Sequence, residues 1–473
     1  MATLWQAAAG GTGLHPDVEA FLSSLSVDSR LLGEDIECSI AHAAMLGRQG
    51  ILRPEESASL CAALGLMLAE AKEGKLAIDP DSEDIHSFIE AELTKRLGEA
   101  GKAVHAGRSR NDQVAVAFRL HILRAFDGAG EALLDALDSI LTLASEHRAT
   151  IMPGYTHLQR AQALTLAHHL LAWCAALERD YSRLRDGRER ANECPLGAGA
   201  LAGSGLPTDR ESVAQALGFA RPSRNTMDAV ADRDACVDFA AACSNIMVHL
   251  SRACEDIALW VSTEYGFMAL TDAASTGSSI MPQKRNPDPA ELIRGKTARV
   301  FGALQALLVM QKGLPYAYNR DLQEDKEMFF DIEDTVKGAL RAFAVLVASL
   351  RPNVEKMRRA VDSGFLEATD IAEYLVIEGL PFRTAYQAAK ALVGLSLATG
   401  RRFAEIPEAA ILASHDAFRS FAFDREAFVA YLEPEACVAR RRQVGGPAPE
   451  RTAEEIARLR AFLAKVRGAS GSP

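Results

Sequence analysis

Hydrophobic residues recur along this chain mostly at helical spacing. Residues 133–141 and 300–308 both carry apolar positions at i, i+1, i+4, i+7 and i+8, the stripe that a helix buries. Residues 237–261 carry few charges and are apolar on nearly all sides, which predicts a helix enclosed by other helices in an oligomeric bundle. Alternation with a period of two is scarce. We therefore expect an all-α fold with long helices.

The same pattern divides the chain into three consecutive regions. Residues 1–107 predict a mixed helical N-terminal domain, and residues 108–356 contain the longest helical patterns and predict a central long-helix domain. Residues 357–473 predict a small helical C-terminal domain that begins after an Arg-Pro-Asn break at 351–353. A length of 473 residues fits more than one structural region.

Charge and cysteine usage narrow the class of protein. The net charge of −11 argues against general affinity for nucleic acid or for an anionic membrane, because both reward broad positive surface. No apolar run is long enough to span a bilayer, and the first residues lack the regions of a signal peptide. The eight cysteines contain no Cys-x-x-Cys pair, which suits a reducing compartment. We predict a cytoplasmic protein.

Two segments resemble helix starts that carry side chains able to bind an anion or to exchange a proton. In 108–113, RSRNDQ, a capping box formed by Ser109 and Asp112 would place two arginines near free backbone N–H groups, a site for carboxylates or phosphates. In 152–159, MPGYTHLQ, a second capping box would place His157 in the first helical turn, where the helix dipole keeps imidazole neutral and ready to exchange a proton. Taken alone, the first segment is better explained as a well-capped surface helix with solvated arginines, and a single histidine beside a turn is more often structural.

The most informative stretch is the loop Thr271 to Pro289, which separates two long helical patterns. It is far longer than a connector needs to be, and it combines Gly277 as a hinge with Ser278, Ser279, Lys284 and Asn286. Such a loop is typical of an active-site lid. At its end, Asp288-Pro289 predicts a helix start with Glu291 at the third position, where a glutamate also serves as a cap.

A fourth candidate segment, rich in polar residues, lies at 314–327. Its hydrogen-bonding side chains suit a polar substrate, although a charged, solvated helix is the favoured explanation when the cluster stands alone. The sequence gives little support for a metal site or a dinucleotide site. No cysteine and histidine set has zinc spacing. The glycine-rich segment 195–203 does not match a dinucleotide fingerprint and predicts a close-packed turn instead.

The loop segment GSSIMPQKRNP at 277–287 closely resembles the signature of the fumarase, aspartase and argininosuccinate lyase superfamily. Three further segments resemble the argininosuccinate lyase branch and its δ-crystallin relatives: HAGRSRNDQ at 105–113, PGYTHLQRAQ at 153–162 and YNRDLQEDK at 318–326. The similarity extends over nearly the whole chain. It implies a homotetramer whose central helices form a twenty-helix bundle, with each active site assembled from three subunits.

The resemblance implies a carbon–nitrogen lyase that splits argininosuccinate into arginine and fumarate by β-elimination, the last step of arginine biosynthesis, without a cofactor or metal. It implies that Ser278 is the general base, that His157 is the general acid or proton partner oriented by Glu291, and that Lys284 and Asn286 stabilise the extra negative charge on the carboxylate. Which of Ser278 and His157 takes the proton stays open.

A second set of residues matches positions that hold the substrate's carboxylates and its amino-acid part. These residues are Ser24, Arg110, Asn111, Thr156, Tyr318, Gln323 and Lys326. Asp84 and His86 match a stretch that lines the site, and their role is left open. The chain departs from the usual family residues at 6–9, Ala106, Ala163 and Tyr386.

Two alternatives remain. A sister lyase that releases fumarate from another N-substituted aspartate would keep Ser278, His157 and Lys284. It would treat Tyr318, Gln323 and Lys326 differently, and in this chain those three match the argininosuccinate pattern. An inactive, crystallin-like structural relative is the second alternative, and the retention of the catalytic positions argues against it.

Overall fold

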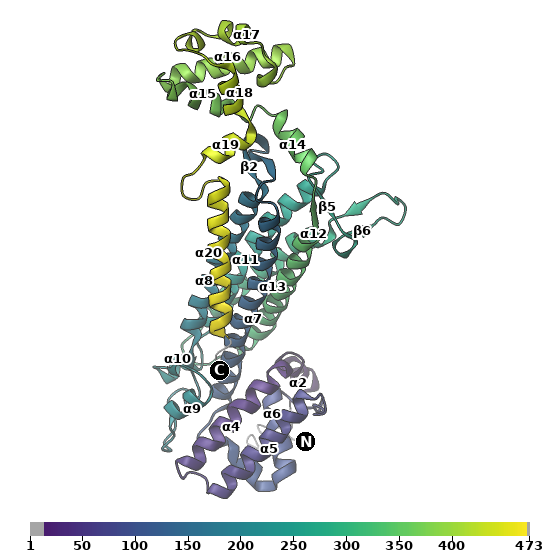
Figure 1. Cartoon of the computed structure of the whole chain (residues 1–473). Helices are drawn as coiled ribbons and strands as arrows, with labels where there is room; N and C mark the ends of the chain where they lie inside the picture. The colour runs from purple at the N-terminus through teal and green to yellow at the C-terminus, as the bar shows by residue number, and fades with distance from the viewer. Residues whose placement is uncertain (1–13, 471–473) are drawn as a thin grey trace. The chain divides into compact units, whose positions relative to one another are not determined.

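The computed structural model describes residues 14–470 and is built almost entirely of helices, which confirms the all-α prediction (Figure 1). The departure at 6–9 lies outside the described residues. The helices are α2 (Pro16–Leu22), α3 (Leu25–Asp28), η1 (Ser29–Leu31), α4 (Leu32–Arg48), α5 (Pro54–Lys72), α6 (Ile85–Leu97), η2 (Gly98–His105), α7 (Arg110–Glu146), α8 (Leu166–Ala191), α9 (Arg210–Ala216), α10 (Thr226–Ala229), α11 (Asp234–Val261), η3 (Asp272–Ala274), α12 (Asp288–Gln311), η4 (Arg320–Glu324), α13 (Asp325–Ala348), α14 (Val354–Asp362), α15 (Ala368–Ile377), α16 (Phe382–Thr399), η5 (Phe403–Glu405), α17 (Glu408–Ser414), η6 (Asp416–Arg419), α18 (Arg425–Leu432), α19 (Pro434–Arg440) and α20 (Pro449–Ser470).

Short strands pair into four two-stranded ribbons. The antiparallel pairs are β1 (Ile151–Thr156) with β2 (Gln159–Thr165), β5 (Met268–Leu270) with β8 (Leu350–Pro352), and β6 (Thr276–Gly277) with β7 (Arg285–Asn286). The strands β3 (Glu193–Cys194) and β4 (Arg221–Pro222) pair in parallel. Two of these ribbons carry residues of the candidate site.

The chain divides into two compact units. The first comprises the described part of Met1–Glu131 together with Asp180–Met247 and Lys296–Lys337. Its N-terminal helices α4, α5 and α6 share a core that includes Ile36, Leu60 and Phe88. The division differs from the three consecutive regions expected from sequence, because the long helices α7, α8, α11, α12 and α13 each contribute residues to both units. The boundaries after residues 107 and 356 stay a prediction.

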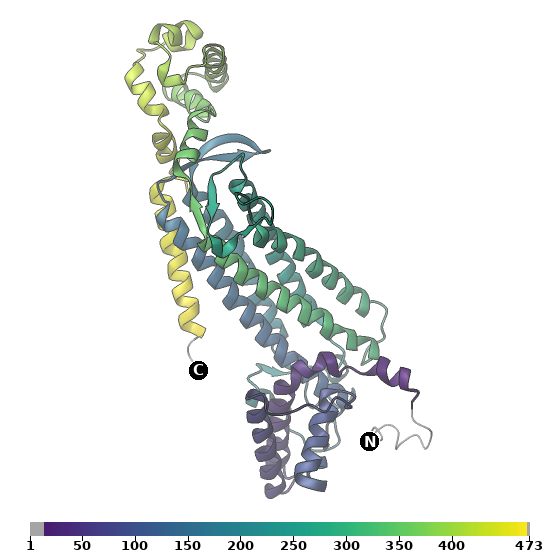
Figure 2. The ribbon, with the colours of Figure 1, turned by 90° about the vertical axis from the view of Figure 1, so that its right-hand side faces the viewer.

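The second unit comprises Ala132–Arg179, Val248–Gly295 and the described part of Gly338–Pro473. Within it, α15 to α18 enclose a core of their own around Phe418 and Phe428. The last helix, α20, runs alongside α7 and α8 (Figures 1 and 2). Arg458 of α20 pairs with Glu178 at 2.7 Å, and Arg467 pairs with Asp138 at 3.1 Å. These ion pairs lie at the edge of the bundle.

The predicted helical stripes are buried to different extents. On α7 the stripe at 133–141 is fully covered, as predicted. On α12, Val300 and Leu307 are buried, but Phe301 and Leu308 are 43% and 50% exposed, so the prediction that the whole stripe is buried is wrong for the single chain. The physical reason is that these apolar positions spread over more of the helix surface than the neighbouring helices of the same chain can cover.

Among residues 14–470, no helix is long and apolar enough to cross a membrane.

Candidate active site

The first group of candidate residues begins at the start of α7. Asp112 accepts a hydrogen bond from the backbone N–H of Ser109 at 2.9 Å, and the hydroxyl of Ser109 accepts one from the N–H of Asn111 at 3.3 Å. Asp112 thus forms its half of the capping box expected from sequence, whereas the Ser109 hydroxyl caps the N–H of Asn111 instead of that of Asp112. These hydrogen bonds fix the backbone from which Arg110 and Asn111 project.

Arg110 is held by groups from two helices. Its guanidinium donates to the hydroxyl of Ser87 and to the side-chain oxygen of Gln113, both at 3.3 Å, and it lies 3.8 Å from the carboxylate of Asp84. Asp84 in turn caps α6 by accepting from the N–H of Ser87 at 2.6 Å. Burial alone would raise the pKa of Asp84, but His86 and Arg110 outweigh it and lower the pKa. The ionised carboxylate and the arginine therefore stabilise each other.

The turn before α3 comes close to the start of η4. Ser24 donates its hydroxyl proton to the carboxylate of Asp28, and its backbone N–H donates to the carbonyl of Glu83 at 3.2 Å. Gln323 donates to the carbonyl of Leu22 at 3.2 Å. The structure thus brings Ser24 and Gln323 together, although about 300 residues separate them in sequence.

Tyr318 and Lys326 complete this group. Tyr318 packs against a small apolar cluster that contains Ala198 and Val230, and burial raises the pKa of its phenol. Lys326 is buried and donates to Asp325 at 2.8 Å, while Arg233 forms an ion pair with the other oxygen of that carboxylate. Two cations that share one anion leave positive charge at this position, which suits a carboxylate ligand.

The glycine-rich segment 195–203 packs against the start of α7. Asp112 is fully buried and accepts hydrogen bonds from the N–H groups of Gly197 at 3.0 Å and Gly199 at 2.8 Å. Asn111 donates to the carbonyl of Ala200 at 3.2 Å. Burial raises the pKa of Asp112 to about 6, and the backbone donors hold it from rising further. The close-packed turn expected here is therefore a wall of the candidate site.

The second group begins with Thr156 and His157, and here one expectation from sequence is wrong. Residues 151–165 form the β1–β2 hairpin, with Thr156 opposite Gln159, so His157 does not lie in a helical turn. His157 and Leu158 have φ values of 55° and 56°, as a two-residue type I′ turn requires. Helix α8 begins only at Leu166. The reason is that the two strands pair across the turn, which a local helix cap cannot outweigh.

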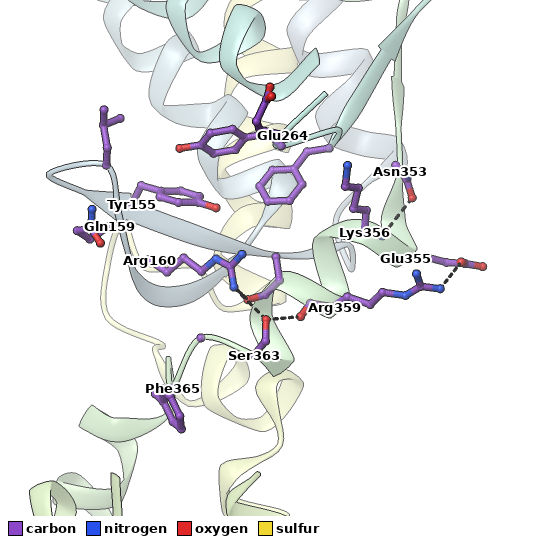
Figure 3. A pocket seen from close by; sticks show the side chains of 15 residues that line it. Tyr155, Gln159, Arg160, Glu264, Asn353, Glu355, Lys356, Arg359, Ser363 and Phe365 are labelled. Carbon is purple, nitrogen blue, oxygen red and sulfur yellow. Dashed lines mark hydrogen bonds and ion pairs between the residues drawn. The ribbon is translucent and has the colours of Figure 1, made fainter. Parts of the chain in front are cut away.

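The hairpin is anchored close to its turn by Arg160, which pairs with Tyr155 across the two strands. Arg160 donates to the carbonyl of Ala360 and to the hydroxyl of Ser363, both at 2.9 Å, which ties β2 to α14 (Figure 3). A groove of about 830 Å³ lies between the hairpin and α14, with Tyr155 and Phe267 on its wall. His157 and Thr156 themselves are exposed.

The loop around Ser278 is a small hairpin as well. Strands β6 and β7 pair Thr276 with Asn286, so residues 278–284 form its tip, and Figure 1 shows β6 on a protruding arm. The hydroxyl oxygen of Ser278 accepts from the N–H groups of Ile280 at 3.4 Å and Met281 at 3.2 Å. Lys284 is exposed beside them. This arrangement places two donors where negative charge on the serine oxygen would develop.

The twelve candidate residues divide between the two compact units, six in each. Ser24, Arg110, Asn111, Tyr318, Gln323 and Lys326 lie in the first unit, and Thr156, His157, Ser278, Lys284, Asn286 and Glu291 lie in the second. Within the described residues, His157 makes no hydrogen bond with Glu291, so the implied orientation of one by the other stays a prediction. Helix α12 begins at Asp288, whose carboxylate accepts from the hydroxyl of Thr276.

Sequence reasoning missed the carboxylate of Asp35. It is fully buried on α4 and accepts hydrogen bonds from Gln113 and His86, two residues far away in sequence. An acidic residue amid the apolar positions of α4 was the available signal, because buried carboxylates are rare unless they are paired.

Comparisons with known proteins agree on one family. The family model described as lyase matches residues 16–302, and the model described as argininosuccinate lyase C-terminal matches 365–439. The argininosuccinate lyases of Desulforudis audaxviator and Moorella thermoacetica are each 50% identical to this chain over 452 residues. These alignments cover 95% of this chain and 97% and 96% of those proteins.

Solved structures support the same fold. EDDS lyase in complex with formate is 28% identical, with a TM-score of 0.82, and the match covers 97% of this chain and 92% of that one. A class II fumarase from Schistosoma mansoni shares the fold with a TM-score of 0.72 at 17% identity, over 86% of this chain and 90% of the other.

Proposed function

This chain belongs to the argininosuccinate lyase family, and we propose that it cleaves argininosuccinate into arginine and fumarate in the last step of arginine biosynthesis. The observation that carries the proposal is the 50% identity, over 95% of the chain, to curated argininosuccinate lyases. Further support comes from the segments that carry most of the candidate residues: three of them, at 105–113, 153–162 and 318–326, resemble this branch, and the fourth, at 277–287, resembles the signature of the whole superfamily.

In the proposed reaction, Ser278 takes the proton from the succinyl carbon that lies beside a carboxylate. The electron pair of the broken C–H bond moves onto that carboxylate, where Lys284 and Asn286 stabilise the added charge. The electron pair then forms the C=C bond of fumarate as the C–N bond breaks, and the departing guanidino nitrogen receives a proton from His157. The two backbone N–H groups that point at the Ser278 oxygen support its role, because they stabilise an alkoxide.

The first group is proposed to bind the substrate. Arg110 and Lys326 supply positive charge for carboxylates, and Ser24, Asn111, Tyr318 and Gln323 supply hydrogen bonds, as Thr156 does from the second group. Support comes from the way these side chains are fixed: Arg110, Asn111, Gln323 and Lys326 each donate at least one hydrogen bond to the protein. Side chains already held in place lose little entropy on binding.

We also propose a homotetramer in which subunits share each active site. Helix α12 exposes Phe301, Leu308 and Val309, the last of these at 61%, and large apolar side chains in one row suit burial against other copies. The acid–base residues support sharing too. His157 and Lys284 are exposed in the single chain, whereas a general acid needs a site that excludes water. In addition, we propose a cytoplasmic location, which is supported by eight cysteines that are all free.

The test of the reaction is the rise in ultraviolet absorbance from fumarate when purified protein meets argininosuccinate. EDDS, adenylosuccinate, aspartate and malate are run in parallel. We expect release from argininosuccinate alone. Fumarate release from EDDS or adenylosuccinate instead would favour a sister lyase. A folded protein that releases no fumarate from any of the five compounds would favour the inactive relative.

Two variants test the shared site. Ser278→Ala and His157→Asn should each be inactive while the oligomer stays intact. If subunits share sites, mixing the two variants after partial unfolding and reassembly should restore part of the activity, because some sites then receive a native Ser278 and a native His157 from different chains. Near-normal activity of Ser278→Ala would contradict its role, and no recovery from well-mixed oligomers would contradict sharing.

A further inference from the structure

Behind Arg110 lies a buried polar network whose centre is the carboxylate of Asp35. Its two oxygens accept from the side-chain nitrogen of Gln113 at 3.1 and 2.9 Å, and one of them also lies 2.7 Å from Nδ1 of His86. Asp35 is fully buried, and Gln113 and His86 are 2% and 1% exposed. Such a carboxylate persists only when donors surround it.

The surroundings of Asp35 favour its ionised form. Burial alone would raise the pKa of Asp35, but His86, Arg108 and the Gln113 amide outweigh it and lower the pKa to about 2. The carboxylate is therefore ionised throughout the neutral range and accepts hydrogen bonds without donating any.

An ionised Asp35 determines which way the amide of Gln113 points. Only the nitrogen end of that amide can face a carboxylate, so the oxygen end must face the other way. There it lies 3.3 Å from a guanidinium nitrogen of Arg110, which donates to it. A reversed amide would place N–H groups against a guanidinium, which has donors only. Asp35 thus controls the acceptor that holds Arg110.

We propose that Asp35 is a positioning residue that fixes Arg110 for substrate binding by orienting the amide of Gln113. The inference rests on the proposed function, in which Arg110 binds a substrate carboxylate. Arginine carries a large side-chain entropy, so a guanidinium already held by Gln113 and by Ser87 binds an anion at lower cost. Asp35 itself does not touch the substrate, because Gln113 lies between it and Arg110.

The first variant is Asp35→Asn, which keeps the shape and removes the charge. Its amide nitrogen can face Gln113, which then turns its own nitrogen toward Arg110. We expect KM for argininosuccinate to rise about 10- to 100-fold, the usual effect of losing a hydrogen bond to a charged group, with kcat within about twofold. Gln113→Leu should show the same split between KM and kcat.

The double variant Asp35→Asn with Gln113→Leu tests whether one residue acts through the other. We expect its KM to be no higher than that of Gln113→Leu alone, because Asp35 has nothing left to orient. A native KM in Asp35→Asn, or effects that multiply in the double variant, would overturn the proposal.

Ser57→Ala is the matched control for general destabilisation. Ser57 is buried on α5 and donates to the carbonyl of Ala43 at 2.9 Å. Ala43 lies on α4, the helix that carries Asp35, but this hydrogen bond is outside the network. This variant should melt earlier and keep a native KM. If its KM rose as much as that of Asp35→Asn, the effect would come from lost stability, and the positioning role would be rejected.

A crystal structure of Asp35→Asn separates failure of this inference from failure of the proposed function. We expect the contact between the Gln113 oxygen and Arg110 to be lost, whatever the protein catalyses. Its persistence would overturn the inference even in an active enzyme. In contrast, a native protein that releases no fumarate would refute the proposed function. The role of Asp35 in orienting Gln113 would then be decided by the crystal structure of Asp35→Asn alone.

Discussion

Gly199 occupies a position that another residue can adopt only with strain. Its φ is +62°, a left-handed conformation that costs an L-residue about 1–2 kcal/mol. A Cβ atom at this position would also lie 2.5 Å from the carbonyl oxygen of Gly203. Because that oxygen belongs to the backbone of the same tight turn, relief requires the turn to shift, which adds about 1–3 kcal/mol.

We therefore expect Gly199→Ala to destabilise the first unit by about 2–5 kcal/mol, which corresponds to a fall in melting temperature of roughly 5–10 °C. Gly205→Ala is the matched control, since no atom lies within 4 Å of the place that its Cβ would occupy and its φ is not positive. The control should melt within about 2 °C of the native protein. Both melting curves should be recorded by circular dichroism at one protein concentration.

The effect of Gly199→Ala should depend on pH. A shifted turn takes the N–H groups of Gly197 and Gly199 away from Asp112, whose pKa is about 6. These donors stabilise the ionised carboxylate more than the protonated group, so their loss costs more stability above pH 6 than at pH 5, where Asp112 is mostly protonated. The difference in melting temperature should be larger at pH 8 than at pH 5. Equal melting temperatures for the two alanine variants would refute the reasoning.

Two further substitutions test buried charges. Asp325→Asn leaves the buried cations Arg233 and Lys326 without their anion, so urea unfolding should show a loss of about 3–5 kcal/mol, and an unchanged midpoint would contradict the ion-pair geometry. Glu367→Gln should act in the opposite direction. Burial raises the pKa of Glu367 from 4.5 to about 7, so the cost of ionising this side chain grows as pH rises from 4.5 and is complete above pH 7. The variant should be about 1–3 kcal/mol more stable than the native protein at pH 8 and only slightly more stable at pH 5, as measured by urea unfolding at the two pH values, and a variant less stable at pH 8 would exclude this burial cost.

The long helices could be predicted from sequence because their signal is repeated many times. On α7 the stripe of apolar residues at 133–141 recurs at helical spacing and is buried against the same chain. On α12 the same kind of pattern predicted burial correctly for Val300 but not for Phe301. Periodicity reports that a side chain is apolar, and it does not distinguish a core within one chain from a surface that meets another.

The β1–β2 hairpin shows where local reasoning fails. Its turn residues, His157 and Leu158, both have positive φ although neither is glycine or asparagine, the residues that usually mark such a turn. The segment also contains a threonine and a glutamine at the spacing of a helix cap, so the sequence favoured the wrong element. What decides the structure is the pairing of residues 151–156 with 159–165, including Ile151 with Thr165.

The network around Asp35 could not be predicted for a different reason. It joins α4, α6 and α7 through residues that are 51 and 78 positions apart from Asp35, and no local pattern links them. Motif resemblance identified Arg110 but not the groups that hold it, because motifs report residues that are adjacent in sequence. Asp35, which contacts Gln113, is fully buried behind them.

The two residue groups differ in how they are held, and this difference bears on mechanism. Two side chains proposed to bind the substrate are tied to buried carboxylates, as Arg110 is through Gln113 to Asp35 and as Lys326 is to Asp325. The side chains proposed to transfer protons, His157 and Ser278, instead occupy hairpin tips, and the hairpin that carries Ser278 is closed by only two paired positions. A ribbon of that length is marginally stable by itself. A hairpin that is marginally stable by itself is the kind of segment that ligand binding can order, which is the behaviour expected of a lid that carries the proposed base, Ser278.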